Sequence, residues 1–118
     1  MNINNKKLAI PGFDTPWLNG FHITFENGYT LSIQWKSGNY CGNYYNDDFC
    51  NRSRNPSKDA EIAILDPFGE LLDEDTFNKY LPESIEALDN VCGYITPNEA
   101  LYVMNQVANI PKRRGLYD

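Results

Sequence analysis

Two runs of alternating apolar and polar residues, separated by Asn27-Gly28, constrain the fold of this chain more than any other feature. Every second residue is apolar over positions 21–25, and the same period of two resumes over positions 29–35. Such alternation is typical of half-buried β-strands, and an Asn-Gly pair between two strands is typical of a hairpin turn. Residues 21–35 are therefore predicted to form a β-hairpin.

The register of this hairpin follows from the faces that each loop length would create. A two-residue loop would mix apolar and polar side chains on both faces of the hairpin. A three-residue loop, Glu26-Asn27-Gly28, pairs Phe25 with Tyr29 and leaves one face wholly apolar. Because a slip of one residue moves every side chain to the other face, the three-residue loop is predicted. Gly28 then adopts the left-handed conformation, and His22 faces solvent from the polar side.

A helix is predicted over residues 97–110. The sequence Thr96-Pro97-Asn98-Glu99 combines a capping box with proline at the first helical position, and a second proline at position 111 ends the pattern. Leu101, Met104 and Ala108 share one face, which is expected to pack on the apolar face of the hairpin. Three further apolar residues flank this stripe: Ala100, Val103 and Val107.

The remaining patterns complete an α+β fold. Residues 61–65 read as a strand, residues 66–69 (Asp-Pro-Phe-Gly) as a type I turn, and Leu71 and Leu72 as the return strand. Residues 91–95 read as a last strand. The prediction is a four- to five-stranded antiparallel sheet of hairpins with one C-terminal helix packed on one face.

The length of 118 residues fits a single domain spanning residues 1–118. Residues 1–19, rich in Asn, Pro and Gly, are predicted to form an irregular N-terminal arm. Residues 38–60 lack any regular period and are predicted to form a long loop, and loops of this length are uncommon in compact domains unless they are functional or disordered.

The formal net charge of −6 disfavours general nucleic-acid binding, because a negative surface repels phosphate backbones. No stretch approaches the ~18 apolar residues of a membrane span, and residues 1–10 lack the apolar core of a secretory signal. The three cysteines are an odd number, which suits reduced thiols better than a disulfide framework. We therefore expect a cytoplasmic protein without direct contact to membranes or nucleic acids.

The composition of the 38–60 loop makes it the candidate site. Tyrosine, arginine and asparagine side chains alternate there, as in loops that bind proteins. Three interpretations stay open: a surface for a partner protein, a site that stacks on a nucleotide-like ligand with arginines on its phosphates, and a cover for the sheet edge. The candidate binding residues are Tyr40, Tyr44, Tyr45, Asp47, Asp48, Phe49, Arg52 and Arg54.

Catalytic and metal-binding patterns are weak. The cysteines at 41, 50 and 92 and His22 lack the spacing of zinc ligands. Cys41 and His22 form the only conventional nucleophile and base pair, and no third group orients the imidazole. Cys41 is expected in an exposed loop, and Cys92 in a buried strand. Asp47-Asp48 could bind Mg²⁺ or act in acid–base chemistry, but no companion group is evident. We expect no metal, cofactor or catalytic residue.

Several segments resemble small uncharacterised proteins of bacteriophages and prophages. They are residues 21–34 (FHITFENGYTLSIQ), 38–41 (GNYC), 60–63 (AEIA) and 93–99 (GYITPNE), within a resemblance that covers most of residues 20–110. The resemblance implies a phage accessory protein made in the bacterial host cytoplasm. It carries over no catalytic residue. The resulting hypothesis is a non-enzymatic protein that binds and modulates a host protein, with a defence system as one target. The alternatives are a small-ligand binder and a small metal-dependent hydrolase.

Overall fold

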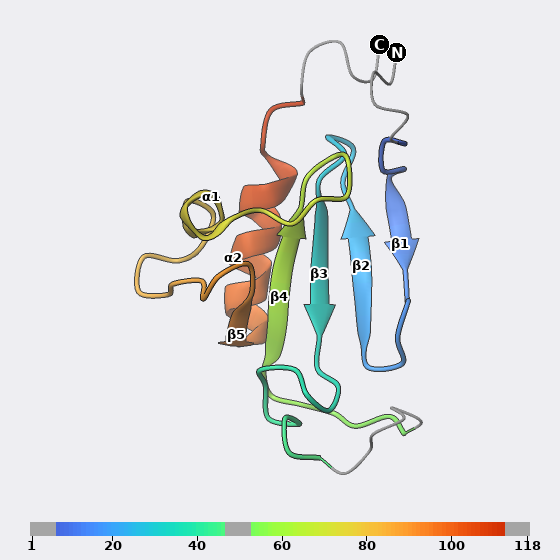
Figure 1. The fold of residues 1–118 in the computed structure, drawn as a ribbon, viewed down its shortest axis with the longest axis vertical. Helices are drawn as coiled ribbons and strands as arrows, with labels where there is room; N and C mark the ends of the chain where they lie inside the picture. The colour runs from blue at the N-terminus through green and yellow to red at the C-terminus, as the bar shows by residue number, and fades with distance from the viewer. Residues whose placement is uncertain (1–6, 47–52, 113–118) are drawn as a thin grey trace.

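The fold is α+β, with a five-stranded antiparallel sheet and two helices, as the sequence predicts in class and sheet size (Figure 1). The structure, a computed structural model, describes residues 7–46 and 53–112. The strands follow the chain order β1-β2-β3-β4-β5 across the sheet, so each strand pairs with its sequence neighbours. In order, the elements are β1 (Gly12–Asp14), β2 (Gly20–Thr24), β3 (Thr30–Gln34), β4 (Ala60–Leu65), α1 (Glu74–Asn78), β5 (Cys92–Ile95) and α2 (Pro97–Ala108).

The hairpin β2–β3 has the predicted register. Ile23 lies opposite Leu31, and Thr24 lies opposite Thr30. The Phe25 N–H donates to the Tyr29 carbonyl at 2.9 Å, and the Gly28 N–H donates to the Phe25 carbonyl at 2.9 Å. Gly28 has a φ of 90°, so the three-residue loop with a left-handed glycine is confirmed.

Replacing Gly28 by valine should lower the free energy of unfolding by about 2 kcal/mol, because a β-branched side chain is strained at positive φ. Chemical denaturation measures the change. Gly28→Asn is the matched control and should cost clearly less, since asparagine tolerates this conformation better than other non-glycine residues. Equal stability of Gly28→Val and the wild type would contradict the assigned turn.

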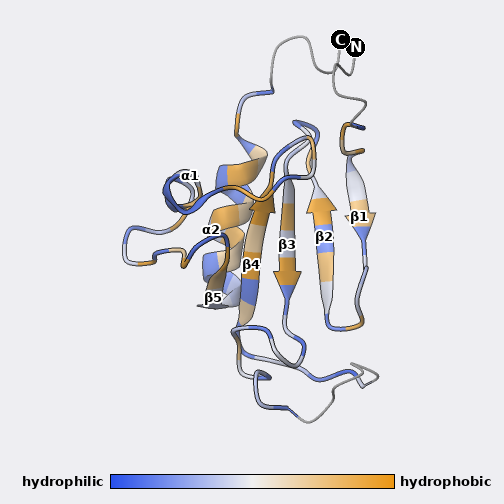
Figure 2. Ribbon diagram, viewed as in Figure 1, coloured by the Kyte–Doolittle hydropathy of each residue, from blue (hydrophilic) through white to orange (hydrophobic). Residues whose placement is uncertain are grey.

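Helix α2 packs across the apolar face of the sheet, and Figure 1 shows it behind and to the left of β4. Figure 2 shows apolar positions along these strands and along α2. The buried side chains of α2 are Ala100, Val103 and Val107, whereas Leu101 is 57% exposed and Ala108 is exposed. The predicted Leu101, Met104 and Ala108 stripe is therefore wrong for Leu101 and Ala108, whereas Met104 is partly buried and packs against the core. Relative to the prediction, the helix is rotated about its axis, so that Ala100, Val103 and Val107, the residues predicted to flank the stripe, face the sheet.

The turn residue Asn27 also holds the C-terminal end of α2. Its side chain is 6% exposed, and its amide donates to the carbonyls of Val107 at 2.8 Å and Ile110 at 2.9 Å. Its Oδ1 accepts the Tyr29 N–H at 3.0 Å. The last carbonyls of a helix have no partner within the helix, so the hairpin turn supplies one for α2.

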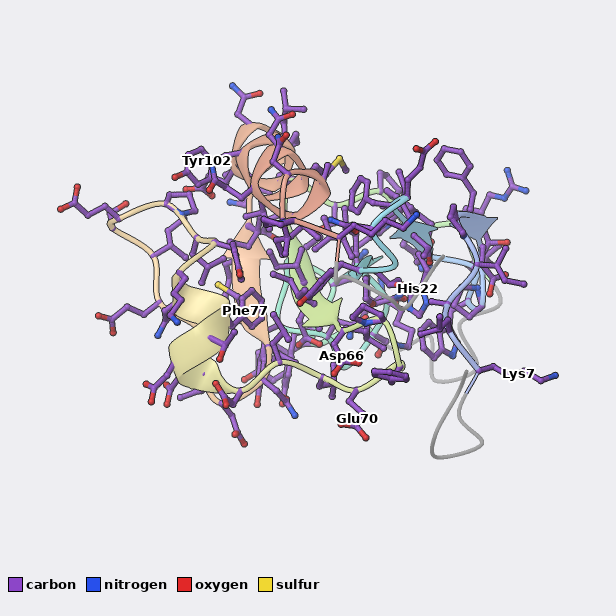
Figure 3. The ribbon with its side chains drawn as sticks, turned by 90° about the horizontal axis from the view of Figure 1, so that it is seen from above. Lys7, His22, Asp66, Glu70, Phe77 and Tyr102 are labelled. Carbon is purple, nitrogen blue, oxygen red and sulfur yellow. The ribbon has the colours of Figure 1, made fainter. Side chains whose placement is uncertain are left out.

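The second face of the hairpin is less open to solvent than predicted. Thr30, Ser32 and Gln34 are all buried. Figures 1 and 3 place the loop around Asp66, which follows β4, on the side of the sheet opposite α2. His22 is half-buried, and the Trp17 ring meets it edge-on at 5.7 Å between ring centres. His22 therefore lies on the predicted polar face but is only partly open to solvent.

Two further predictions need correction. Residues 12–14 of the predicted irregular arm form the edge strand β1, with Phe13 opposite Ile23. The predicted return strand is reduced to a single bridge between Leu65 and Leu71. The reason is the early start of α1, whose N-cap Asp73 follows almost at once and accepts the Thr76 N–H.

Candidate functional site

Residues 36–46, which include the start of the predicted 38–60 loop, form a compact hydrogen-bonded segment at one end of the sheet (Figure 1). The Gly38 N–H donates to the Tyr44 carbonyl at 3.2 Å, and the Tyr44 N–H donates to the Cys41 carbonyl at 3.0 Å. The Ser37 hydroxyl donates to the Asn46 carbonyl at 2.6 Å. This segment therefore has a defined backbone shape.

Two carboxylates at the start of β4 fix this segment to the sheet. Glu61 accepts the Tyr40 N–H at 2.8 Å and the Asn39 side-chain amide at 3.1 Å. Asp59 accepts the Gly42 N–H at 2.7 Å. Hydrogen bonds to ionised acceptors are stronger than neutral ones, so these acids act as structural anchors.

The side chain of Asn43 joins the two ends of the loop. Its amide donates to the Trp35 carbonyl at 2.8 Å and to the Asn55 carbonyl at 3.0 Å. Asn39 is also buried, and its Oδ1 accepts the Lys36 N–H at 3.0 Å. The asparagine side chains of the loop thus provide hydrogen-bond partners for backbone groups.

Three tyrosines gather on this fixed backbone, and we call them the tyrosine surface: Tyr40, Tyr44 and Tyr45. The rings of Tyr40 and Tyr44 are stacked, with 5.6 Å between centres and 5° between planes. Tyr45 meets Tyr44 edge-on at 4.8 Å and is itself 90% exposed, while Tyr40 is 41% exposed. The tyrosines form a contiguous aromatic patch whose outer rings are open to solvent.

Strand β5 supports the tyrosine surface from the side. The Tyr94 N–H donates to the Tyr40 carbonyl at 2.9 Å. Tyr94 has a φ of 57°, which is rare for a bulky residue, and its side chain is 57% exposed. Tyr94 could not be selected from the sequence, because nothing in its pattern distinguishes it from an ordinary strand residue.

Replacing Gly93 by alanine should lower the free energy of unfolding by about 2 kcal/mol and loosen the tyrosine surface. A Cβ at Gly93 would lie 2.5 Å from the Tyr40 Cβ and 3.0 Å from its carbonyl oxygen, so β5 and the loop must separate. Chemical denaturation measures the stability, and faster hydrogen exchange of the Tyr94 amide reports the separation.

Gly42→Ala is the matched control for Gly93→Ala. A Cβ at Gly42 would meet the Ser57 hydroxyl oxygen at 3.2 Å, and this side-chain atom can move aside. Its effect should stay within about 0.5 kcal/mol. The close packing of β5 on the loop would be contradicted if both substitutions had the same effect.

The other candidate residues are not part of the tyrosine surface as described. Asp47, Asp48, Phe49 and Arg52 lie outside the described residues, as does Cys50. Arg54 lies elsewhere, in a pocket that none of the three tyrosines lines. The structure thus brings together three of the eight candidates.

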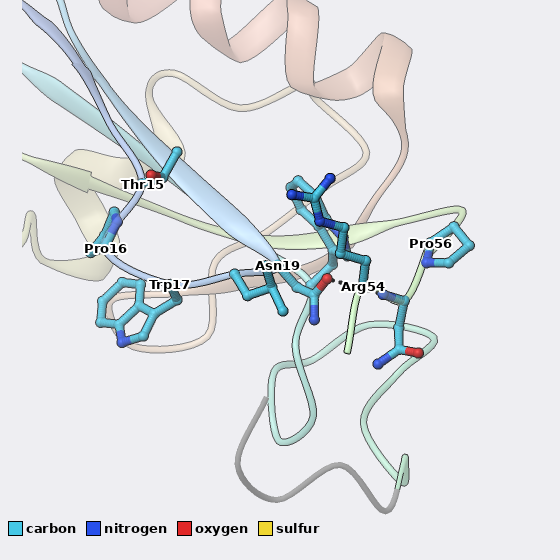
Figure 4. Close-up of a pocket in the computed structure, with 9 residues that line it drawn as sticks. Thr15, Pro16, Trp17, Asn19, Arg54 and Pro56 are labelled. Atoms are coloured by element: carbon cyan, nitrogen blue, oxygen red, sulfur yellow. Dashed lines mark hydrogen bonds between the residues drawn. The ribbon is translucent and has the colours of Figure 1, made fainter. Parts of the chain in front are cut away.

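This pocket lies between the β1–β2 connection and the segment that leads into β4 (Figure 4). Its volume is about 710 Å³, and Trp17, Trp35 and Arg54 are among its lining residues. In the sequence, Trp17 is an isolated aromatic residue and Trp35 belongs to a predicted strand. The signal that could have identified them is the rarity of this residue type, since the chain contains two tryptophans and both line the pocket.

The two described cysteines, Cys41 and Cys92, are poorly suited to nucleophilic catalysis. Cys41 is 2% exposed, so its predicted exposure is wrong, and burial raises the pKa of its thiol. Burial raises the pKa of Cys92 to about 11, and the expectation of a buried thiol there is confirmed. Partial burial lowers the pKa of His22, against an opposing effect of Asp14. Both thiols therefore stay protonated at neutral pH, and a thiolate is what nucleophilic attack needs.

Within residues 7–46 and 53–112, no group of three or more His, Cys, Asp and Glu side chains is arranged to hold a metal ion. In the same part of the chain, no helix has the length and apolar character to cross a membrane. Comparisons with protein-family models, curated proteins and solved structures give no match to this chain.

Proposed function

We propose that this chain is a non-enzymatic binding protein that attaches to a partner protein through the tyrosine surface. The observation that carries the proposal is the packing of Tyr40, Tyr44 and Tyr45 into one patch, with Tyr45 almost fully exposed. Tyrosine is enriched among the residues that contribute most to binding at protein interfaces.

The fixed backbone beneath the tyrosines supports this function. An interface side chain that is already held in place loses less conformational entropy on binding, so more of its contact energy appears as affinity. The anchors at Glu61 and Asp59 and the bridge made by Asn43 provide this order. The backbone that carries the tyrosines is therefore ordered before a partner binds.

The partner we propose is a host bacterial protein in the cytoplasm, with a defence system as one target. The support for this part is the resemblance of four segments to phage and prophage proteins. The protonated state of the Cys41 and Cys92 thiols favours binding over nucleophilic catalysis. The acidic net charge of −6 suits a partner with a basic surface.

Replacing Tyr44 and Tyr45 together by alanine should weaken the complex with the partner by about 100-fold, because buried aromatic contacts at the centre of an interface dominate its affinity. The wild-type chain first captures the partner from a bacterial lysate. The purified partner is then titrated against both proteins by calorimetry, which also gives the stoichiometry, expected to be one to one.

Tyr102→Ala is the matched control, since Tyr102 is a 44% exposed tyrosine that belongs to α2 (labelled in Figure 3) and not to the loop. It should leave the affinity unchanged. Thermal denaturation of the double variant checks that it remains folded. A folded double variant that binds as tightly as the wild type would refute the proposal.

A further inference from the structure

Hydrogen bonds within the protein hold one wall of the pocket shown in Figure 4 in place without a ligand. Asn19 lies at its base, is 2% exposed, and donates to the Ser53 carbonyl at 2.9 Å. Its Oδ1 accepts the Asn55 N–H at 3.1 Å, and its carbonyl accepts the Trp35 N–H at 2.8 Å. One buried residue, through its side chain and its backbone carbonyl, thus links three segments that line the pocket.

The walls of the pocket are aromatic and apolar. Both tryptophans of the chain line it, together with Leu18 and Pro56. Trp17 is held from two sides, by the edge-on contact with His22 and by the Lys36 ammonium, which lies 4.6 Å from the centre of the ring. Indole rings are flat apolar surfaces on which a planar ligand can stack.

The charge of the pocket is opposite to that of the chain. The net charge of the protein is −6, yet the residues described as lining this pocket include Arg54 and no carboxylate. Lys36 adds a second positive charge beside Trp17. A guanidinium forms paired hydrogen bonds with phosphate and carboxylate groups, so the pocket is complementary to an anion.

We propose that this pocket binds a small planar anion of the mononucleotide type. The planar base stacks on the indole rings, and the phosphate pairs with Arg54. The volume of about 710 Å³ lies in the range of about 300–1,000 Å³ that small-molecule sites occupy. The pocket is separate from the tyrosine surface, so this binding goes beyond the proposed protein–protein contact.

A titration with adenosine monophosphate tests the proposal, read by tryptophan fluorescence because both tryptophans line the pocket. We expect a saturable change in emission. Adenosine, which has the base without the phosphate, should bind about tenfold more weakly, since a hydrogen bond to a charged group is lost. Inorganic phosphate alone should cause no change. A single-stranded oligonucleotide should bind more weakly than the monophosphate, because the acidic chain repels a polyanion.

Arg54→Gln should reduce the affinity for adenosine monophosphate to that for adenosine. Lys79→Gln, which removes the same charge at the end of α1, should leave the affinity unchanged. Tyr44→Ala combined with Tyr45→Ala should also leave it unchanged, which separates this site from the tyrosine surface.

Three results would overturn the proposal. The first is the absence of a saturable signal with adenosine monophosphate up to about 10 mM, because a Kd above this concentration corresponds to negligible specific binding. The second is equal affinity for adenosine and its monophosphate, or an unchanged affinity in Arg54→Gln. The third is tighter binding of the oligonucleotide, which would assign the site to nucleic acid.

Discussion

Replacing Phe77 by alanine should lower the free energy of unfolding by about 4 kcal/mol. Phe77 is 0% exposed and is the buried side chain of α1, whose five residues cannot form a stable helix alone. Its removal leaves a cavity in the cluster that includes Ile62 and Ile64 of β4. Urea denaturation measures the change. Because a domain of this size is stable by about 5–15 kcal/mol, the loss is a large fraction of the total.

Phe13→Ala is the control for this substitution. Phe13 lies on the edge strand β1 and is 82% exposed, so its removal should change the stability by no more than about 0.5 kcal/mol. Comparable losses for Phe77→Ala and Phe13→Ala would contradict the assigned core.

Replacing Asn27 by alanine should lower the free energy of unfolding by about 2 kcal/mol, because the carbonyls of Val107 and Ile110 each lose the hydrogen bond from the Asn27 side-chain amide. Asn27→Asp should destabilise at least as much, although it keeps the size of the side chain, since a carboxylate would face the same carbonyl oxygens. Chemical denaturation compares the two variants with the wild type.

Asn98→Ala is the matched control for Asn27, since Asn98 is an exposed asparagine in the first turn of the same helix. It should change the stability little. The role of Asn27 as a cap for α2 would be wrong if Asn27→Asp were as stable as the wild type.

The hairpin could be predicted from sequence because its information is local. Alternation with period two defines the strands, and only one loop length puts all apolar residues on one face. The link between Asn27 and α2 could not be predicted, because it joins residues 80 positions apart. The same Asn-Gly pair suits a hairpin with or without a helix beside it.

The errors in the fold prediction occur where several arrangements fit the local sequence equally well and only tertiary contacts determine which one forms. Helix α2 carries apolar residues over a wide arc, and the sequence does not show which part of the arc meets the sheet. The strand β1 has three residues, too few for a period to appear. The burial of Ser32 and Gln34 depends on segments distant in sequence, which a two-stranded model of the hairpin does not include.

The residue types of the candidate site could be predicted from the sequence, but their arrangement in space could not. The frequency of tyrosine marked residues 38–60, and three of these tyrosines do come together. The anchoring role of Glu61 and Asp59 could not be predicted, because their partners are two backbone amides and the Asn39 side chain, which no sequence pattern identifies. The pocket combines Trp17, Trp35 and Arg54 from three separate segments, so no local motif could indicate it.

The most direct test of the central claim is hydrogen exchange of the backbone amides with and without the bound partner protein. Binding through the tyrosine surface predicts new protection at residues 40–46 and at Tyr94, with the outer side of α2 around Tyr102 unchanged. Protection confined to α2 or to the β1 edge, with exchange in the loop unaltered, would contradict the account.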